Sequence, residues 1–220
     1  MNRYIDLKEV SDGKLYTSND LVKVGCGDCA GCSSCCQTMA DTIILDPMDI
    51  YLLTRRLDTS AADLVSRSLV LELGVVDGII LPHIRMDGTS GRCPLLTDAG
   101  RCSVHDSRPG FCRLFPLGRY YENRSFRYFL QVNECRRTNR SKVKVRKWIG
   151  MADFDRYETF IRDWHYFLKD LQESLAKKDM EREKQVNTMI LNTFFFRPYD
   201  TRADFYPQFY GRLEEVSASL

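Results

Sequence analysis

Cysteine thiols are the residues of this 220-residue chain whose spacing points most directly to chemistry. Five of its nine cysteines fall within eleven residues, in the run C-G-D-C-A-G-C-S-S-C-C at 26–36, and the other four follow by residue 135. Thiolates are the ligands that soft metals prefer, and two-residue spacers let successive sulfurs converge on one centre. The spacing therefore indicates either a metal site or a set of disulfides.

The first ten residues favour metal over disulfides. They are polar and mixed in charge, with no apolar segment of a secretory signal, and no run in the chain approaches the ~18 apolar residues of a membrane span. We therefore expect a cytoplasmic protein without membrane contact, in a compartment that keeps thiols reduced. The odd number of cysteines and the vicinal pair Cys35–Cys36 also argue against ordinary disulfides.

Two ligand sets can be drawn through the first cluster. Cys26-x2-Cys29-x2-Cys32-x3-Cys36 has the spacing of a bacterial ferredoxin run, but glutamine follows it in place of proline and no second copy is present. The alternative set starts at Cys29, uses both Cys35 and Cys36, and leaves Cys26 as an extra thiol. The small residues between the sulfurs allow backbone amides to approach the thiolates.

The four distal cysteines would supply further ligands, for a second site or for the same cluster. Cys93 and Cys102 are predicted to face each other across a hairpin. Cys112 lies between Pro109 and Pro116, with arginines nearby that offset thiolate charge. His105 follows Cys102 by three residues, and we expect a polar residue at a hairpin end there, not a ligand.

These motifs resemble the CxxCxxCC family, the YkgJ-like cysteine-cluster proteins, over roughly residues 21–135. The resemblance is carried by C-A-G-C-S-S-C-C at 29–36, C-P-L-L at 93–96, C-S-V-H at 102–105, R-P at 108–109, C-R-L-F-P-L at 112–117 and a last cysteine at 135. The family is described as zinc- or iron-chelating and shows eight cysteines. The resemblance thus implies the metal ligands Cys29, Cys32, Cys35, Cys36, Cys93, Cys102, Cys112 and Cys135. Cys26 departs from the eight-cysteine pattern and is a further candidate.

The identity of the metal is predicted from the ligand spacing. A C-x2-C-x2-C run is more typical of a cubane [4Fe-4S] cluster than of zinc knuckles, and vicinal cysteines do not easily bind one small tetrahedral ion. The spacing therefore favours an iron–sulfur cluster, with zinc as the alternative. A more distant similarity to flagellin lysine methylase also implies a cluster, but this shorter chain does not inherit methyl transfer.

The remaining sequence predicts an α+β fold. Residues 1–150 form a cysteine-rich metal-binding domain of β-hairpins and short helices, and a helical extension, 151–220, packs on it. Hairpins are predicted at 75–80, 93–104 and 118–132. Helices are predicted to begin at Asp46-Pro47 and at Thr59 or Ser60, the second carrying Leu64, Val65 and Leu69.

The C-terminal part shows the clearest periodicity. Apolar residues at helical spacing between Phe154 and Leu175 predict an amphipathic helix of about six turns that packs against the cysteine domain. A second helix is predicted over 181–196. The aromatic tail that follows Pro198 is weakly helical.

The segment 136–147 has seven basic residues of twelve and no acid, which suggests an anionic partner. Basic residues alternate with valines at Lys142, Lys144 and Arg146, which is typical of a strand with one solvent-exposed face. Without a phosphate-binding loop, an RNA-binding aromatic motif or a recognition helix, the segment argues against nucleic-acid binding. The identity of any partner protein and the oligomeric state are not predicted.

The sequence shows no Ser-His-Asp pattern, HExxH, GxGxxG or supported carboxylate pair, so it assigns no catalytic residue and leaves enzymatic activity open. The favoured interpretation is a cytoplasmic metal-binding protein with a redox or accessory role. One alternative is a structural zinc module that docks an anionic partner through 136–147. The other is a cluster-dependent protein-modifying enzyme, distantly like the methylase.

Overall fold

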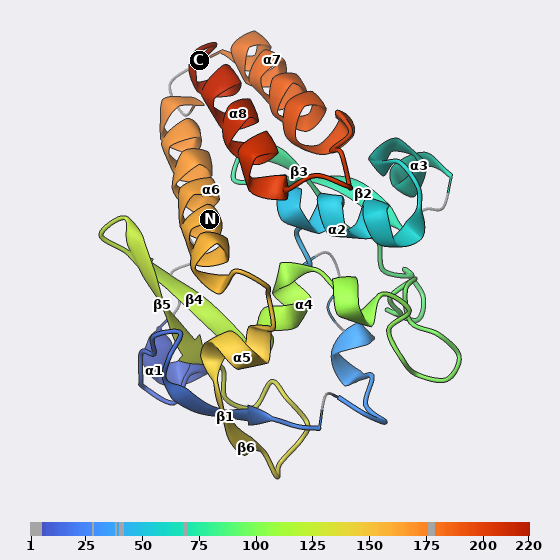
Figure 1. Cartoon of the computed structure of the whole chain (residues 1–220), viewed down its shortest axis with the longest axis vertical. Helices are drawn as coiled ribbons and strands as arrows, with labels where there is room; N and C mark the ends of the chain where they lie inside the picture. The colour runs from blue at the N-terminus through green and yellow to red at the C-terminus, as the bar shows by residue number, and fades with distance from the viewer. Residues whose placement is uncertain (1–5, 28, 38, 40–41, 68–69, 176–178) are drawn as a thin grey trace.

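The computed structural model describes residues 6–27, 29–37, 39, 42–67, 70–175 and 179–220, which form an α+β fold as predicted (Figure 1). Its helices are α1 (Leu7–Val10), α2 (Pro47–Leu57), α3 (Ala61–Ser66), α4 (Gly110–Leu114), α5 (Val145–Ile149), α6 (Phe154–Leu175), α7 (Met180–Ile190) and α8 (Phe205–Ser217). Shorter helical turns are η1 (Ser34–Cys36), η2 (His105–Ser107) and the π-helical η3 (Leu191–Phe196).

The strands of the described residues form three separate antiparallel pairs. They are β1 (Leu21–Gly25) with β6 (Ser141–Lys144), β2 (Leu71–Val76) with β3 (Ile79–Ile84), and β4 (Leu117–Glu122) with β5 (Ser125–Leu130). The strand predicted in the basic segment is therefore confirmed over four residues, and Val145 begins α5 instead of continuing it.

Side-chain caps fix the start of α2 and α3 where the sequence predicts them. The Asp46 carboxylate accepts from the Asp49 amide at 2.9 Å, and the Asp49 carboxylate accepts from the Asp46 amide at 3.1 Å, which is a reciprocal capping box. Ser60 caps α3 by accepting from the Asp63 amide at 3.1 Å. Leu69, predicted on the apolar face of α3, lies outside the described residues.

Two of the three predicted hairpins are confirmed. β2–β3 turns at Asp77 and Gly78, with φ of 49° and 83°, and β4–β5 turns at Asn123 and Arg124, with φ of 51° and 53°. Two successive positive φ angles are what a tight two-residue hairpin requires, because they match the twist of the strands.

The hairpin predicted over 93–104 is present only as a short antiparallel turn, with the Ser103 amide donating to the Leu95 carbonyl at 2.8 Å, and the predicted facing of Cys93 and Cys102 is wrong. The chain there forms a loop with one isolated bridge, between Leu96 and Cys102, so Cys93 does not lie opposite Cys102. Pro94 has no amide to extend a ladder, and Thr97 closes the loop by bonding Arg101 through its backbone and hydroxyl.

The predicted six-turn helix is α6, and its aromatic residues pack on the other C-terminal helices. The Phe160 ring lies 5.2 Å from Phe205 and 4.7 Å from Phe209, and Trp164 lies 5.0 Å from Phe194. α6 also contacts the β4–β5 hairpin of the predicted cysteine domain, where the Tyr121 and His165 rings stack at 3.4 Å and the Tyr166 hydroxyl donates to the Ser125 carbonyl at 3.0 Å. Figure 1 shows α6, α7 and α8 together at one end of the molecule, next to α2. The second predicted helix is α7, which continues through Phe196 as η3.

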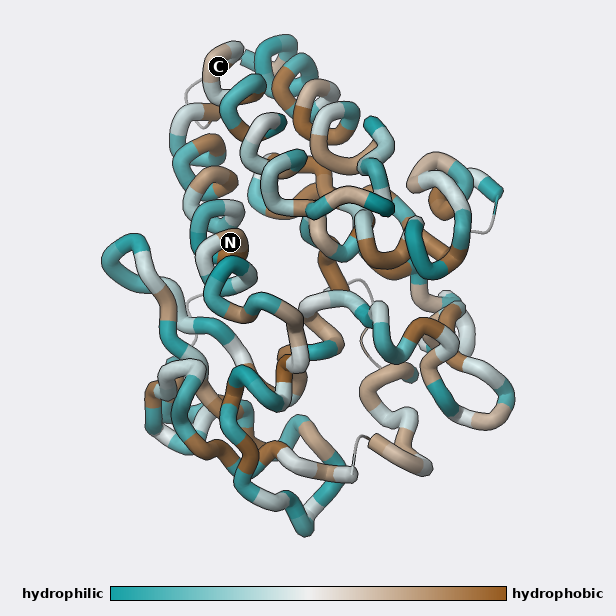
Figure 2. Tube along the Cα trace, viewed as in Figure 1, coloured by the Kyte–Doolittle hydropathy of each residue, from teal (hydrophilic) through white to brown (hydrophobic). Residues whose placement is uncertain are grey.

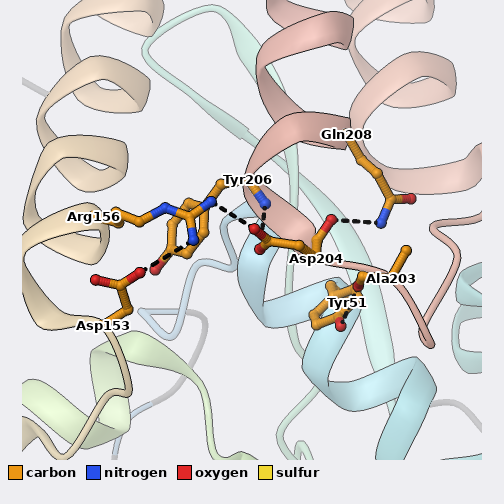
Figure 3. A network of polar contacts seen from close by, with 7 residues as sticks. All are labelled: Tyr51, Asp153, Arg156, Ala203, Asp204, Tyr206 and Gln208. Carbon is orange, nitrogen blue, oxygen red and sulfur yellow. Dashed lines mark hydrogen bonds and ion pairs between the residues drawn. The ribbon is translucent and has the colours of Figure 1, made fainter.

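A polar network ties these helices to α2 (Figure 3). Arg156 of α6 contacts Asp153 at 3.1 Å and Asp204 at 2.6 Å, and Asp204 caps the start of α8. The Tyr51 hydroxyl of α2 donates to the Ala203 carbonyl at 3.0 Å. The start of α8 is thus held from two sides.

One hydrophobic core cluster includes residues from both predicted parts of the chain. Val24 of β1, Leu53 of α2, Ile149 of α5 and Phe209 of α8 are all fully buried members of it. Figure 2 shows hydrophobic positions concentrated in the middle of the molecule and a hydrophilic tip on the β4–β5 hairpin. Among the described helices, none combines the length and apolar character needed to cross a bilayer.

This shared core predicts that the chain unfolds as one unit. Phe209→Ala should lower the free energy of unfolding by about 3–5 kcal/mol, because it leaves a cavity among four aromatic rings. Met180→Ala is the matched control; Met180 is 86% exposed, so the change should be within about 0.5 kcal/mol. Denaturant unfolding, followed by tryptophan fluorescence and by circular dichroism, measures both. Two separate transitions, with only one shifted by Phe209→Ala, would contradict a shared core.

Candidate metal centre

Seven of the eight predicted ligands line one cavity of about 80 Å³. They come from the loop around η1, the loop at 93–102 and α4, and they are Cys29, Cys32, Cys35, Cys36, Cys93, Cys102 and Cys112. The first cluster and the distal cysteines therefore meet at one place. The sulfurs surround the cavity, and no three Cys, His, Asp or Glu side chains within the described ranges are grouped as ligands of a single ion.

The other two cysteines lie outside this lining. Cys135, the eighth predicted ligand, is half-buried and is not among the lining residues. Cys26 is also absent from the lining, although its Sγ lies 3.6 Å from the Sγ of Cys29. All nine cysteines are free thiols.

Backbone contacts bring the η1 loop against the Cys93 loop. The Cys93 amide donates to the Cys36 carbonyl at 2.8 Å, which links two lining cysteines directly. Gly91 has a φ of 66°, and a Cβ on it would lie 2.7 Å from the Gln37 carbonyl oxygen. Glycine is needed at this position because both the backbone angle and the close approach exclude a side chain.

Cys112, which lies between Pro109 and Pro116, is placed by the short helix α4. α4 follows Pro109, and the Asp49 carboxylate of α2 accepts from the Gly110 amide at 2.7 Å. This buried bond joins the first turn of α4 to the first turn of α2, which are 61 residues apart. Burial raises the pKa of Asp49, and repulsion from Asp46 adds to it.

Arginines accompany the sulfurs. Arg101 and Arg108 line the cavity, and Arg137 donates to the Ala30 carbonyl in the first cysteine loop. In the described part of the chain, Arg108 Nε and Arg137 Nε are buried without an acceptor. Because buried donors are normally paired, these groups fit a site that carries negative charge when filled.

His105 also lines the cavity but is not placed as a ligand. Its Nε2 lies 2.7 Å from Nη1 of Arg108. A guanidinium can only donate, so this ring nitrogen accepts and its lone pair is engaged.

Most lining thiols are held in their neutral form. Burial, followed by a hydrogen bond with Cys26, raises the pKa of Cys29 to about 12. Burial raises the pKa of Cys112, and repulsion from Cys93 adds to it. The pKa of Cys35 is raised first by its hydrogen bond with Cys36 and then by burial. A metal that binds these thiols must therefore displace protons.

Cys32 is the exception. Hydrogen bonds with the backbone and the side chain of Ser34 lower the pKa of Cys32, and Arg137 adds a smaller effect in the same direction. Cys32 is therefore easier to ionise than the lining thiols whose pKa burial raises.

A larger hollow of about 240 Å³ lies away from the sulfurs, between the tip of the β4–β5 hairpin and α6 and α8. Its charged side chains pair with one another: Arg124 with Asp170 at 2.7 Å, and Arg162 with Asp163 at 2.8 Å. This hollow offers no soft ligand.

The comparisons with known proteins agree with the geometry. Residues 28–142, more than half of the chain, match the model of the CxxCxxCC family, described as "Putative zinc- or iron-chelating domain". The chain belongs to the CxxCxxCC family. The matched range includes every lining cysteine and Cys135, and it leaves Cys26 outside. No curated protein and no solved structure matches the chain.

Sequence reasoning missed three parts of this site. Trp148 lines the cavity far from any motif, and its indole donates to the carbonyl of Phe115, another lining residue, at 3.2 Å. Asp49 lies in the first turn of the helix predicted to begin at Asp46-Pro47, but no sequence signal shows that it also bonds Gly110. The close approach of Gly91 to Gln37 could not be predicted from the sequence either, because a glycine in a loop is compatible with many backbone conformations.

The close approach at Gly91 yields a prediction about site assembly. Gly91→Ala should destabilise the metal-free chain by about 2 kcal/mol, through its left-handed backbone and its clash with Gln37, and should reduce metal uptake. Gly88→Ala is the matched control in the same loop, because a Cβ there meets nothing within 4 Å. Unfolding curves and metal content per chain provide the measurements. Equal behaviour of the two variants would show that the Gly91 contact does not hold the cysteine loops together.

Proposed function

We propose that the lining cysteines hold an iron–sulfur cluster of the [4Fe-4S] type and that the protein has a redox or cluster-carrying accessory role. The observation that carries this proposal is the meeting of seven sulfurs, from segments up to 83 residues apart, at one cavity. Membership of a zinc- or iron-chelating family supports metal binding at the same cysteines. When bound, such a cluster supplies one-electron redox chemistry.

The arrangement of the sulfurs favours a cluster over a single zinc ion. A structural zinc site needs four ligands in a tetrahedron, whereas seven thiols face this cavity. Cys35 and Cys36 both belong to the lining, and neighbouring residues are better suited to two metal atoms of a cluster than to one small ion. Four thiolates, supplied by different loops around the cavity, would complete a cubane.

The surrounding residues suit a negatively charged centre. Arg108 lines the cavity with a buried Nε that lacks an acceptor within the described residues, and its charge favours the thiolates of Cys29 and Cys102. The same donor would hydrogen-bond to sulfur, a contact that tunes the reduction potential of a cluster.

The position of the cavity near the surface suits the transfer of electrons or of a cluster to a partner protein. Six of the seven lining cysteines are only half-buried, and only Cys93 is buried. A centre this close to the surface is open to electron transfer or cluster transfer, and we therefore favour an accessory role over a purely structural one.

Cysteine variants test the proposal. After anaerobic reconstitution with ferrous iron and sulfide, Cys112→Ser should retain less than about half of the wild-type iron and acid-labile sulfide, because ligand geometry is lost. Cys26→Ser should retain the wild-type content, because Cys26 does not line the cavity. Full iron and sulfide in Cys112→Ser, or equal loss in both variants, would contradict the assignment of the lining cysteines.

A second candidate function, docking of an anionic partner, is favoured by the β1–β6 ribbon. Lys23 lies directly opposite Lys142, while Val22 faces Val143 on the other side of the ribbon. Like charges directly opposite each other are destabilising. Among the described residues, neither lysine forms an ion pair with an acid. The ribbon leads into the first cysteine loop, so a partner seated on it would lie beside the metal centre.

A charge reversal tests this docking surface. Lys142→Glu should stabilise the chain slightly, because it replaces repulsion from Lys23 by attraction, yet weaken binding to poly-L-glutamate at low salt at least fivefold. Lys184→Glu, on an exposed position of α7, is the matched control. Binding is measured by fluorescence titration and stability by denaturant unfolding. Equal losses of binding in both variants would show that binding depends only on the net charge of the chain, and would contradict a local docking surface.

A further inference from the structure

Cys26 is a thiol that the metal centre does not use. It lies outside the range matched by the family and outside the cavity lining. Its Sγ is nevertheless 3.6 Å from the Sγ of Cys29, which does line the cavity. Two sulfurs at this distance are in contact and need to close by only about 1.5 Å to reach the length of a disulfide bond.

The local backbone keeps this pair together. β1 ends at Gly25, paired with Ser141 of β6, so Cys26 follows directly on an anchored strand. Gly27 and Cys29 both have positive φ angles, of 64° and 57°, and the Ala30 amide donates to the Gly27 carbonyl at 3.1 Å. On the far side, the Cys32 amide donates to the Cys29 carbonyl at 3.0 Å. The sulfur contact thus sits within a hydrogen-bonded turn.

We propose that Cys26 and Cys29 form a reversible disulfide that removes Cys29 from the ligand set and so controls loading of the metal centre. Control of metal loading rests on the proposed function, whereas formation of the disulfide does not. The oxidant is a peroxide. One thiol takes an oxygen from hydrogen peroxide to become a sulfenic acid and releases one water. The second sulfur then displaces the hydroxyl, which leaves as a second water, so two thiols lose two hydrogens and one S–S bond forms.

Other pairings are less suited to this bond. Cys35 and Cys36 are adjacent in the sequence, and a vicinal disulfide is geometrically awkward. A disulfide between Cys26 and Cys29 removes only one lining sulfur, because Cys26 does not line the cavity, whereas a disulfide between two lining cysteines would remove two. The two-residue spacing of Cys26 and Cys29 is that of redox-active cysteine pairs.

The bond is tested on the full metal-free chain after full reduction. One equivalent of hydrogen peroxide is added, the remaining thiols are alkylated, and the peptides are mapped by mass spectrometry without reduction. We expect a peptide carrying Cys26 and Cys29 that lacks about 2 Da and both alkyl groups, and that recovers them after dithiothreitol. Cys135→Ser, which removes the other cysteine outside the lining, should give the same peptide. Bonding of Cys29 to another cysteine, or no Cys26–Cys29 peptide, would overturn the proposal.

The loading step is tested on the same samples with ferrous iron and sulfide, in the absence of a thiol reductant. The oxidised wild-type chain should take up at least fivefold less iron than the reduced chain, and dithiothreitol should restore uptake. Cys26→Ser given the same peroxide should load as the reduced wild type does. Unchanged loading of the disulfide form would overturn control by this bond. A reduced wild-type chain that binds neither iron nor zinc would instead contradict the proposed function, while the peptide map still decides the bond.

Discussion

Crowding seven thiols around one small cavity imposes an electrostatic constraint that the rest of the structure has to meet. Burial already raises the pKa of Cys29, Cys93, Cys102 and Cys112, and a thiolate formed at Cys35 repels each of them further. The sulfurs cannot all ionise unless positive charge enters among them. A metal supplies most of that charge, and the arginines around the cavity supply the remainder. Cys32 differs from these thiols, because its contacts with Ser34 lower its pKa.

The scaffold holds the sulfurs through a few specific contacts. The bond from Cys93 to Cys36 joins two cysteine loops, and the bond from Gly110 to Asp49 joins α4 to α2. α2 is in turn tied to α8 through Tyr51 and belongs to the same core as the C-terminal helices. The helical part therefore supports the site without contributing a ligand to it. The shared core and these bonds together hold the cysteine loops in place.

The sequence predicted those features that depend on local chemistry. The Asp46 cap, the Asp77–Gly78 turn and the aromatic stripe of α6 all arise from nearby residues, and all three are confirmed. The failures are features set by distant contacts. The α6 stripe has aromatic partners in α8, and α6 also stacks on Tyr121 of β4; periodicity alone cannot name these partners.

In the metal site, too, features set by nearby residues were predicted and features set by distant contacts were not. The resemblance to the CxxCxxCC family implied the seven sulfurs that line the cavity, and it also grouped Cys135 with them, which the lining does not include. Spacing cannot tell which loop folds back on the others, because that depends on contacts such as Gly91 with Gln37. The roles of Arg108 and Asp49 are likewise products of the fold, since each acts on residues outside its own segment.

The most direct test of this account is the metal content and the ultraviolet–visible spectrum of the wild-type chain purified without oxygen. The account predicts brown protein that contains iron and acid-labile sulfide in equal amounts, with broad visible absorption that dithionite bleaches. Colourless protein that carries one or two zinc ions and no sulfide would contradict it.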